Sequence, residues 1–270
     1  MAKIYLQNKT CYNVIYKTMN KLIISAIASI VLFIFLPHVT LALEGEDIDN
    51  DGITDTDELT IYHTDPLVSD TDGDGYTDGL ETTNGYSPLV TKKKLRQIDT
   101  DRDGLWDDWE LALGTDITKT DTDGDGYSDG KEMANGYDPR STAKQKLSYR
   151  IEVSLHDQQL RYYFGKTKLD GFAISSGLRD TPTPIGKFSV VKKRPIVHYA
   201  GVGFNYPNTK WNLMFKQQKN EFNYYIHGAY WHNSFGKPKS HGCVNVPHVP
   251  EYMGRLYDWA KVGTLVTIIK

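Results

Sequence analysis

The chain has 270 residues, which is enough for about two domains, and its formal net charge of −3 conceals two halves of opposite sign. Residues 44–142 carry 27 Asp and Glu against 8 Lys and Arg, whereas residues 143–270 carry 7 acidic and 19 basic residues. This asymmetry concerns the ions and partners that each half attracts rather than its fold. We expect no nucleic acid among those partners.

Residues 22–36 form an uncharged apolar run that follows a region containing four lysines. A signal-peptide core typically has about 7–15 apolar residues, whereas a membrane-spanning helix needs about 20. The run therefore predicts that residues 1–43 are a signal peptide cleaved near Ala42 or an uncleaved signal anchor in the membrane, and the lysines argue against a buried core helix. Both interpretations place the chain from about Glu44 onward outside the cytoplasm, in the periplasm, in the cell wall or secreted.

The two cysteines, Cys11 and Cys243, lie on opposite sides of this run, so they would not share a compartment. No cysteine closely follows the run, and the sequence therefore gives no sign of a lipid-anchored N-terminus. Cys243 is predicted to be an unpaired thiol, and an odd thiol in an exported protein is a candidate reactive group.

The acidic half contains one 12-residue pattern four times, at residues 47–58, 70–81, 99–110 and 121–132. Each copy has Asp at positions 1, 3, 5 and 9, Gly at position 6, an apolar residue at position 7 and Glu at position 12. In a calcium loop, the side chains at 1, 3 and 5 and the carbonyl at 7 turn inward, the Glu binds through both oxygens, and the Gly permits the sharp turn. A disordered acidic linker would need neither the fixed glycine nor the repeated frame, so we expect about four Ca²⁺ ions. The predicted ligands are Asp47, Asp49, Asp51, Ile53, Asp55 and Glu58; Asp70, Asp72, Asp74, Tyr76, Asp78 and Glu81; Asp99, Asp101, Asp103, Leu105, Asp107 and Glu110; and Asp121, Asp123, Asp125, Tyr127, Asp129 and Glu132.

The four loops come as two pairs, because residues 81–88 and 132–139 match at an offset of 51, which indicates an internal duplication. The sequence has no long flanking amphipathic helices, and position 8 is not the aliphatic residue of a helix-loop-helix calcium hand. The loops are similar instead to the thrombospondin type 3 repeats of secreted bacterial proteins, over about residues 47–139. This resemblance implies that residues 44–142 are a rigid, calcium-filled spacer with no part in the chemistry. We therefore expect a fragment of residues 143–270 to keep its activity without calcium and to need no catalytic cofactor.

From residue 147 the pattern changes to that of a compact β domain. Apolar and polar residues alternate over 151–155 and 160–164, which is the period of half-buried strands, and residues 156–158 predict a hairpin turn between them. One helix is expected between Pro250 and Gly263. Further strands are expected at residues 187–191, 223–227 and 264–269. The predicted fold class is therefore multidomain: a mainly β sandwich or barrel over residues 147–270, with one or two short helices, beside an extended array of EF-hand-like calcium loops.

Two short motifs of this domain carry the candidate chemistry: Ile226-His227-Gly228, and Ser-His-Gly-Cys-Val-Asn from Ser240 to Asn245. A thiol attacks as the thiolate, so it needs a cation or base nearby. A histidine paired with Cys243 can take the thiol proton and later return it to a leaving amine. A glycine beside the nucleophile lets backbone N–H groups face a developing oxyanion. The motifs therefore favour a cysteine acyltransferase over an inert buried thiol.

The two motifs together resemble the signature of the L,D-transpeptidases, a His-Gly followed some distance later by Ser/Thr-His-Gly-Cys. Residues 181–188 and 262–266 add to the resemblance, which spans nearly all of residues 150–270. Many members of that family have Arg where this chain has Asn245. This difference leaves the catalytic groups intact and concerns the substrate preference.

The resemblance assigns a role to each residue of the motifs. It implies that Cys243 is the nucleophile and His227 the general base. It implies that His241 shapes the pocket and assists the thiolate. The N–H groups of Gly242 and Cys243 would form the oxyanion hole.

By the same resemblance, the acyl donor is a tetrapeptide stem of peptidoglycan, and the reaction serves cell-wall biogenesis and cell shape. The enzyme would attack the third residue of the stem, expel D-alanine and pass the acyl group to the amine of a neighbouring stem, forming a 3→3 cross-link. Water as acceptor would make an L,D-carboxypeptidase, and a protein as acceptor would make a protein-to-wall transferase. An alternative from a different class of function is a non-catalytic, calcium-dependent cell-wall-binding protein. Candidate substrate-binding residues are Tyr230, Trp231, Ser240 and Asn245, of which Tyr230 and Trp231 could equally serve packing.

Overall fold

The computed structural model describes residues 45–201, 203–218 and 223–270, and the chain from Gly45 onward forms one compact unit. The expected signal segment and Cys11 lie outside the described residues. In the described part, no helix combines the length and the apolar character that crossing a membrane requires.

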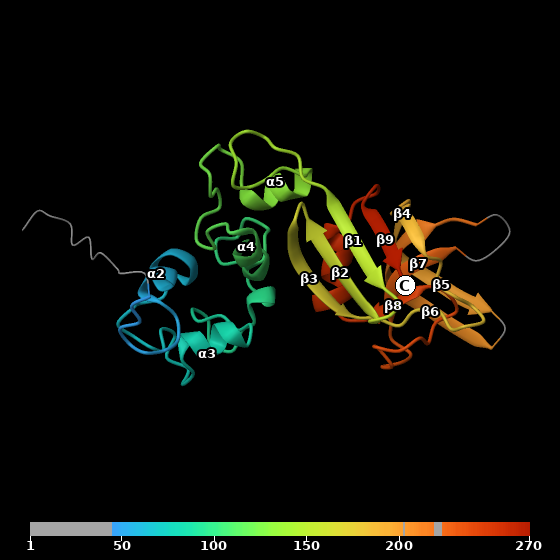
Figure 1. Cartoon of the computed structure of the whole chain (residues 1–270), viewed down its shortest axis with the longest axis horizontal. Coiled ribbons are helices and arrows are strands. Elements are labelled where there is room, and N and C mark those ends of the chain that lie inside the picture. Colours follow the sequence, from blue (N-terminus) through green and yellow to red (C-terminus); the bar gives the residue numbers. More distant parts are fainter. Residues whose placement is uncertain (1–44, 202, 219–222) are drawn as a thin grey trace, which may run out of the picture. The chain divides into compact units, whose positions relative to one another are not determined.

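Each calcium-type loop leads into one short helical segment (Figure 1). These segments are α2 (Asp55–Asp57) with η1 (Glu58–Tyr62), α3 (Asp78–Thr83), α4 (Asp107–Leu113) and α5 (Asp129–Asn135), and a 3₁₀ turn, η2 (Leu95–Gln97), separates the second from the third. The side chains of Thr54, Thr77 and Ser128, at position 8 of their loops, accept hydrogen bonds from N–H groups in the first helical turn. Position 8 is therefore the N-cap of the helix, which explains why three of the four loops have a hydroxyl residue there.

The loops associate in two pairs, as the internal duplication predicts. The N–H of Gly79, in the second loop, donates to the carboxylate of Asp51 in the first, at 2.9 Å. Gly130 in the fourth loop makes the same bond to Asp103 in the third. A Cβ atom on Gly79 would lie 2.3 Å from the Asp51 carbonyl oxygen, and one on Gly130 would lie 2.6 Å from that of Asp103. Only glycine permits this approach of the two backbones.

The second half of the chain folds into two β-sheets that share one hydrophobic core (Figure 1). The strand order is β3-β2-β1-β9-β4 in one sheet and β5-β6-β7-β8 in the other. The strands are β1 (Tyr149–Ser154), β2 (Gln159–Phe164), β3 (Thr167–Ala173), β4 (Gly186–Ser189), β5 (Lys192–Gly201), β6 (Phe204–Lys216), β7 (Tyr224–Ala229), β8 (Val244–Pro247) and β9 (Leu265–Ile269). Strands β1 and β9 are parallel neighbours, and so are β7 and β8. The mainly β class with few short helices is confirmed.

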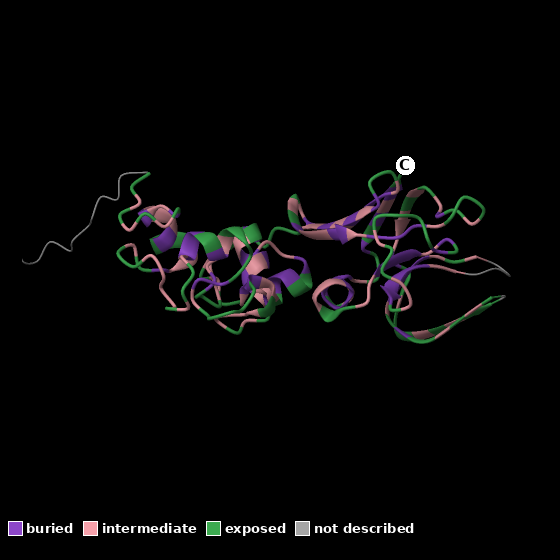
Figure 2. Cartoon of the chain, turned by 90° about the horizontal axis from the view of Figure 1, so that it is seen from below, coloured by how far each residue is buried: buried purple, intermediate pink, exposed green. Residues whose placement is uncertain are grey.

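Buried residues recur along the strands of both sheets and on the short helices (Figure 2). The alternation predicted over 151–155 and 160–164 places Ile151, Leu160 and Tyr162 in the core without exposed surface. The predicted helix is shorter than expected. It consists of one π-helical turn, η3 (Pro250–Gly254), and α6 (Arg255–Trp259).

The third and fourth loops pack against the β domain through α4 and α5. Trp109 and Met133 belong to the same hydrophobic core as the sheets, and the Trp109 ring meets that of Tyr162 edge to face, with centroids 6.1 Å apart. Arg255 on α6 makes two hydrogen bonds, of 2.6 and 2.9 Å, to the carboxylate of Asp108 on α4. The third and fourth loops therefore differ from a spacer that stands apart from the domain, because their apolar side chains pack against the sheet.

Candidate active site and calcium loops

Residues Ser240–Cys243 form a tight loop that ends at the start of β8. The Ser240 hydroxyl accepts a hydrogen bond from the Gly242 N–H at 3.1 Å and donates to the Cys243 carbonyl. Gly242 has a φ of +111°, and a Cβ atom there would lie 2.8 Å from the ring of Tyr224, so the loop requires glycine. The Gly242 N–H, one of the two predicted oxyanion donors, is thus engaged by Ser240 in this structure, whereas the other predicted donor is the N–H of Cys243.

Residues 181–186 support this loop from an adjacent segment. The Thr183 hydroxyl accepts a hydrogen bond from the Gly177 N–H at 2.8 Å and donates to the Gly242 carbonyl at 2.9 Å. Thr183 is only 3% exposed. A Cβ atom on Gly177 would lie 2.1 Å from the Thr181 carbonyl oxygen, so this contact also needs glycine. The sequence marked residues 181–188 as part of the family resemblance but gave no sign of this contact.

His227 lies on β7, where it pairs with Asn245 of β8, and its side chain is buried. The Nδ1–H donates to the carbonyl of Gly228 at 3.0 Å, which leaves Nε2 as the basic nitrogen. Tyr199 of β5 stacks on the imidazole with ring centroids 4.6 Å apart. Burial lowers the pKa of His227 to about 4, against the opposite effect of the bond to Gly228. The ring is therefore neutral at neutral pH.

Cys243 is partly exposed, and its thiol donates to the carbonyl of Asn223 with the sulfur 3.9 Å from the oxygen. Burial raises the pKa of this thiol to about 11, although the backbone N–H of Tyr225 favours the thiolate. At neutral pH the Cys243 thiol and the His227 imidazole are thus both neutral. A neutral thiol can react when a base takes its proton as the sulfur attacks.

Strands β5 and β6 supply aromatic side chains that cover the predicted site residues. Tyr206 lies flat on Trp231, with centroids 3.8 Å apart and planes at 3°. Phe204 stacks on the exposed ring of His241 at 5.0 Å. Neither strand was predicted from the sequence, nor was the position of their aromatic residues. The sequence does place the aromatic residues Phe204 and Tyr206 two positions apart, which is the period of a strand.

The remaining predicted substrate-binding residues occupy different surroundings. Asn245 is buried, and its amide contacts Nε2 of His232 at 3.0 Å. Ser240 is buried as well and holds the nucleophile loop. Tyr230 is half exposed and donates its hydroxyl to the Pro207 carbonyl at 2.7 Å.

In the repeat array, the predicted calcium ligands at positions 1, 3 and 5 come together in every loop. Their carboxylate oxygens lie within 4.8 Å of one another in the four clusters that begin at Asp47, Asp70, Asp99 and Asp121. The Asp at position 9 turns to the residue at position 2 instead. The two oxygens of Asp78, for example, accept hydrogen bonds from the N–H and the hydroxyl of Thr71, at 2.9 and 2.6 Å. Position 9 therefore closes the loop and does not join the cluster.

The buried oxygens of the loops test whether a cation fits. Among the described residues, one oxygen of each position-3 Asp and each position-12 Glu is buried without a hydrogen-bond partner; these belong to Asp49, Glu58, Asp72, Glu81, Asp101, Glu110, Asp123 and Glu132. Burial, together with neighbouring carboxylates, raises the pKa of Glu81 to about 7 and that of Glu110 to about 9. Unpaired buried carboxylates are costly, and a shell of oxygen ligands suits Ca²⁺. The donor atoms of the loops therefore fit Ca²⁺.

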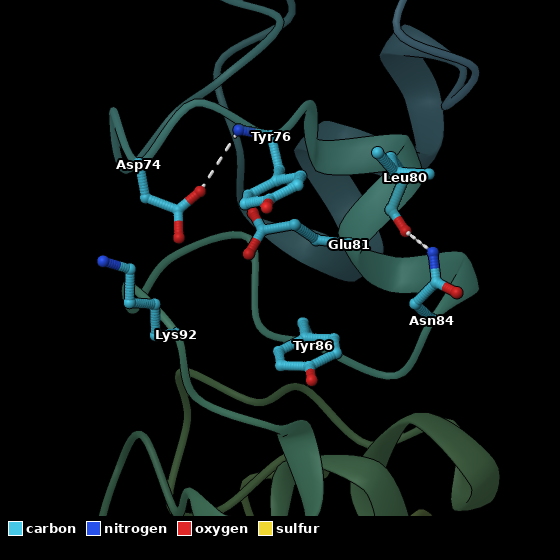
Figure 3. A pocket seen from close by; sticks show the side chains of 7 residues that line it. All are labelled: Asp74, Tyr76, Leu80, Glu81, Asn84, Tyr86 and Lys92. Carbon is cyan, nitrogen blue, oxygen red and sulfur yellow. Dashed lines mark hydrogen bonds between the residues drawn. The ribbon is translucent and has the colours of Figure 1, made fainter.

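Figure 3 shows two of the predicted ligands of the second loop, Asp74 and Glu81. The side chains of Asp74 and Glu81 line a cavity of about 480 Å³, and the rings of Tyr76 and Tyr86 lie beside them. Neither Cys243 nor His227 lines this cavity. The cavity thus belongs to the calcium loop and not to the cysteine chemistry.

Family comparisons identify both halves of the chain. Residues 148–268 match the model of the L,D-transpeptidase catalytic domain. Four segments match the bacterial TSP3 repeat, at residues 47–69, 70–85, 99–116 and 121–139. The chain therefore carries an L,D-transpeptidase catalytic domain, and bacterial thrombospondin type 3 repeats precede it.

Individual relatives match the catalytic part. The chain is 33% identical over 100 residues to YkuD of Bacillus licheniformis, which is named as an L,D-transpeptidase, and the match covers 37% of this chain and 54% of the relative. The chain thus spans about half the length of this curated relative. An L,D-transpeptidase structure from Mycobacterium smegmatis is 21% identical, with 48% of this chain and 65% of that chain covered and a TM-score of 0.41. One from Enterococcus faecium is 28% identical, with 45% and 50% covered and a TM-score of 0.40.

Proposed function

We propose that the chain is a peptidoglycan L,D-transpeptidase that acts outside the cytoplasm and uses Cys243 as its nucleophile. The observation that carries this proposal is the state of His227 within the matched catalytic domain. Its Nδ1–H is held by the Gly228 carbonyl, its Nε2 is left as the base, and its ring is neutral on the strand beside the nucleophile loop. A thiol whose pKa is raised to about 11 needs such a base at the moment of attack.

In the first half-reaction, the Cys243 sulfur attacks the carbonyl of the third stem residue while Nε2 of His227 takes the thiol proton. The Cys243 N–H donates to the oxyanion of the tetrahedral intermediate. The imidazolium then gives its proton to the leaving amine of D-alanine, and a thioester remains. The amine of a second stem then attacks the thioester, and His227 takes a proton from that amine. His227 returns the proton to the departing sulfur, which releases the 3→3 cross-linked product and the free thiol.

The substrate would lie along the aromatic side chains of the second sheet. Trp231 and His241 are held there by Tyr206 and Phe204, and Asn245 stands next to His227 on the neighbouring strand. We propose that these side chains shape the groove for the stem peptide. The four calcium loops would supply structural Ca²⁺, with no cofactor in the chemistry itself.

Two measurements test the function. Intact-mass analysis of the chain with a carbapenem should show one adduct, which Cys243→Ala loses while its fold is retained. Incubation with a defined tetrapeptide stem should release D-alanine and give a cross-linked dimer. A tripeptide as the sole product would replace the transpeptidase by an L,D-carboxypeptidase. No adduct and no turnover would leave only a wall-binding role.

A further inference from the structure

The peptide between Gly242 and Cys243 is held at its carbonyl end by one side chain. A trans peptide is planar, so the carbonyl of Gly242 and the N–H of Cys243 point in opposite directions and turn together. The Thr183 hydroxyl donates to that carbonyl at 2.9 Å and is itself fixed by the Gly177 N–H at 2.8 Å. Fixing the carbonyl therefore fixes the direction of the Cys243 N–H.

This direction matters because the neighbouring donor is already engaged. The Gly242 N–H is bonded to the Ser240 hydroxyl, so the Cys243 N–H is the donor of this loop that can serve the oxyanion. We propose that Thr183 is a positioning residue that aims the Cys243 N–H at the oxyanion, a role that rests on the proposed function. Thr183 comes from the segment before β4, is 3% exposed and has no direct part in the chemistry.

A pair of reactions at the same sulfur tests this role in the full chain. Acylation by a carbapenem builds an oxyanion, whereas alkylation by iodoacetamide does not. Thr183→Val removes the hydroxyl at nearly constant volume and should slow acylation by about 10²-fold, the scale of losing one oxyanion donor, with alkylation changed less than about threefold. Thr183→Ser restores the hydroxyl and should recover most of the rate. Thr264→Val is the matched control, because its buried hydroxyl accepts a hydrogen bond from the Lys261 N–H, outside the nucleophile loop.

Acylation of Thr183→Val within about threefold of wild type would overturn the role, as would an equal loss of acylation and alkylation, which indicates a general structural defect. A wild-type chain that alkylates but never acylates would overturn the proposed function, and this role with it.

A second inference comes from the contact between the repeat array and the catalytic domain. The third loop differs from the first loop in whether its buried side chains belong to the core of the β domain. Leu105 and Trp109 of the third loop and its helix belong to the core of the β domain, whereas Ile53, the corresponding residue of the first loop, is buried outside that core. The adjacent Asp108 holds Arg255 of α6. We infer that calcium in the third loop stabilises the fold of the catalytic domain, and that calcium in the first loop does not.

Position 3 of each loop offers matched variants, because Asp49 and Asp101 both have a buried oxygen without a partner. The quantity to measure is the rise in unfolding temperature between chelator and 1 mM calcium, followed by tryptophan fluorescence, since Trp109 and Trp259 are buried in the shared core. With a Kd of about 10⁻⁴ M, one site should raise that temperature by about 3–6 °C. Asp101→Asn should remove the contribution of one site from this rise in the fluorescence transition, because the fourth loop keeps its ligands, and Asp49→Asn should keep the whole rise. Equal effects of the two variants, or none from either, would overturn the inference.

Discussion

Replacing Asp108 by alanine would leave the guanidinium of Arg255 without its partner. Only 5% of the Arg255 side chain and 19% of that of Asp108 are exposed, and the guanidinium also lies 4.5 Å from the ring of Trp109. Water therefore cannot readily replace the lost carboxylate. We expect the variant to unfold more easily while its catalytic residues keep their places.

The size of this effect follows from the burial of the pair. Removing one partner of a buried pair costs about 3–5 kcal/mol, because the other charge stays buried. Asp108 retains some contact with water, which puts the expected loss at the lower end, about 3 kcal/mol. For a unit of this size, about 1 kcal/mol lowers the unfolding temperature by about 2–4 °C. The variant should therefore melt about 6–12 °C below wild type.

Thermal unfolding of the full chain in calcium, followed by circular dichroism, measures this loss. Adding Arg255→Met to Asp108→Ala should recover most of it, since an apolar pair avoids the buried charge. Lys119→Ala is the control, because its pair with Asp116 has a 65% exposed lysine, and such pairs contribute about 0–1 kcal/mol. A loss below about 1 kcal/mol in Asp108→Ala, or no recovery in the double variant, would refute the reasoning.

Three further predictions concern the catalytic pair and the calcium loops. His227→Ala should slow acylation by about 10²–10⁴-fold, measured with a carbapenem, and a loss under about threefold would transfer the base role to His241. The pKa of His227 is about 4 and that of Cys243 about 11, so the acylation rate should not depend on pH between these values and should fall at lower pH as His227 becomes protonated. A change of the acylation rate with pH near neutrality would contradict a neutral thiol and a neutral imidazole. In chelator, the free energy of unfolding should fall as pH rises from 5 to 9. The folded pKa values of Glu81, about 7, and Glu110, about 9, exceed the usual glutamate value, so the stability that these groups give at low pH is lost as they ionise. Calcium should flatten this dependence on pH, measured by urea titration, and a dependence that calcium leaves unchanged would exclude ion binding at these loops.

Local patterns were the part of this molecule that the sequence could predict. The ligands of each calcium loop lie within twelve consecutive residues, and the nucleophile loop from Ser240 to Cys243 is equally local. Strands β1 and β2 were predicted because one face of each is buried and the other is partly exposed, which leaves a period of two in the sequence.

Contacts between distant residues could not be predicted in this way. The bond from Thr183 to Gly242 joins residues 59 apart, and that from Arg255 to Asp108 joins residues 147 apart. Strand β5 is mostly exposed, so its sequence lacks the alternation that marks a half-buried strand. The motif also does not reveal that the Ser240 hydroxyl accepts a hydrogen bond from the Gly242 N–H.

The place of β9 within its sheet has a consequence for the order in which the protein is made. Strand β9 lies between β1 and β4, and Arg150 of β1 pairs with Leu265 of β9. A ribosome releases the chain from one end, so the nucleophile loop is synthesised before the strand that completes the five-stranded sheet. A nascent chain that ends before residue 265 contains β1, β2, β3 and β4 but lacks β9, the strand that pairs with both β1 and β4. The thiol is therefore synthesised before the strand that joins β1 to β4, and we expect the five-stranded sheet to form only once that strand is present.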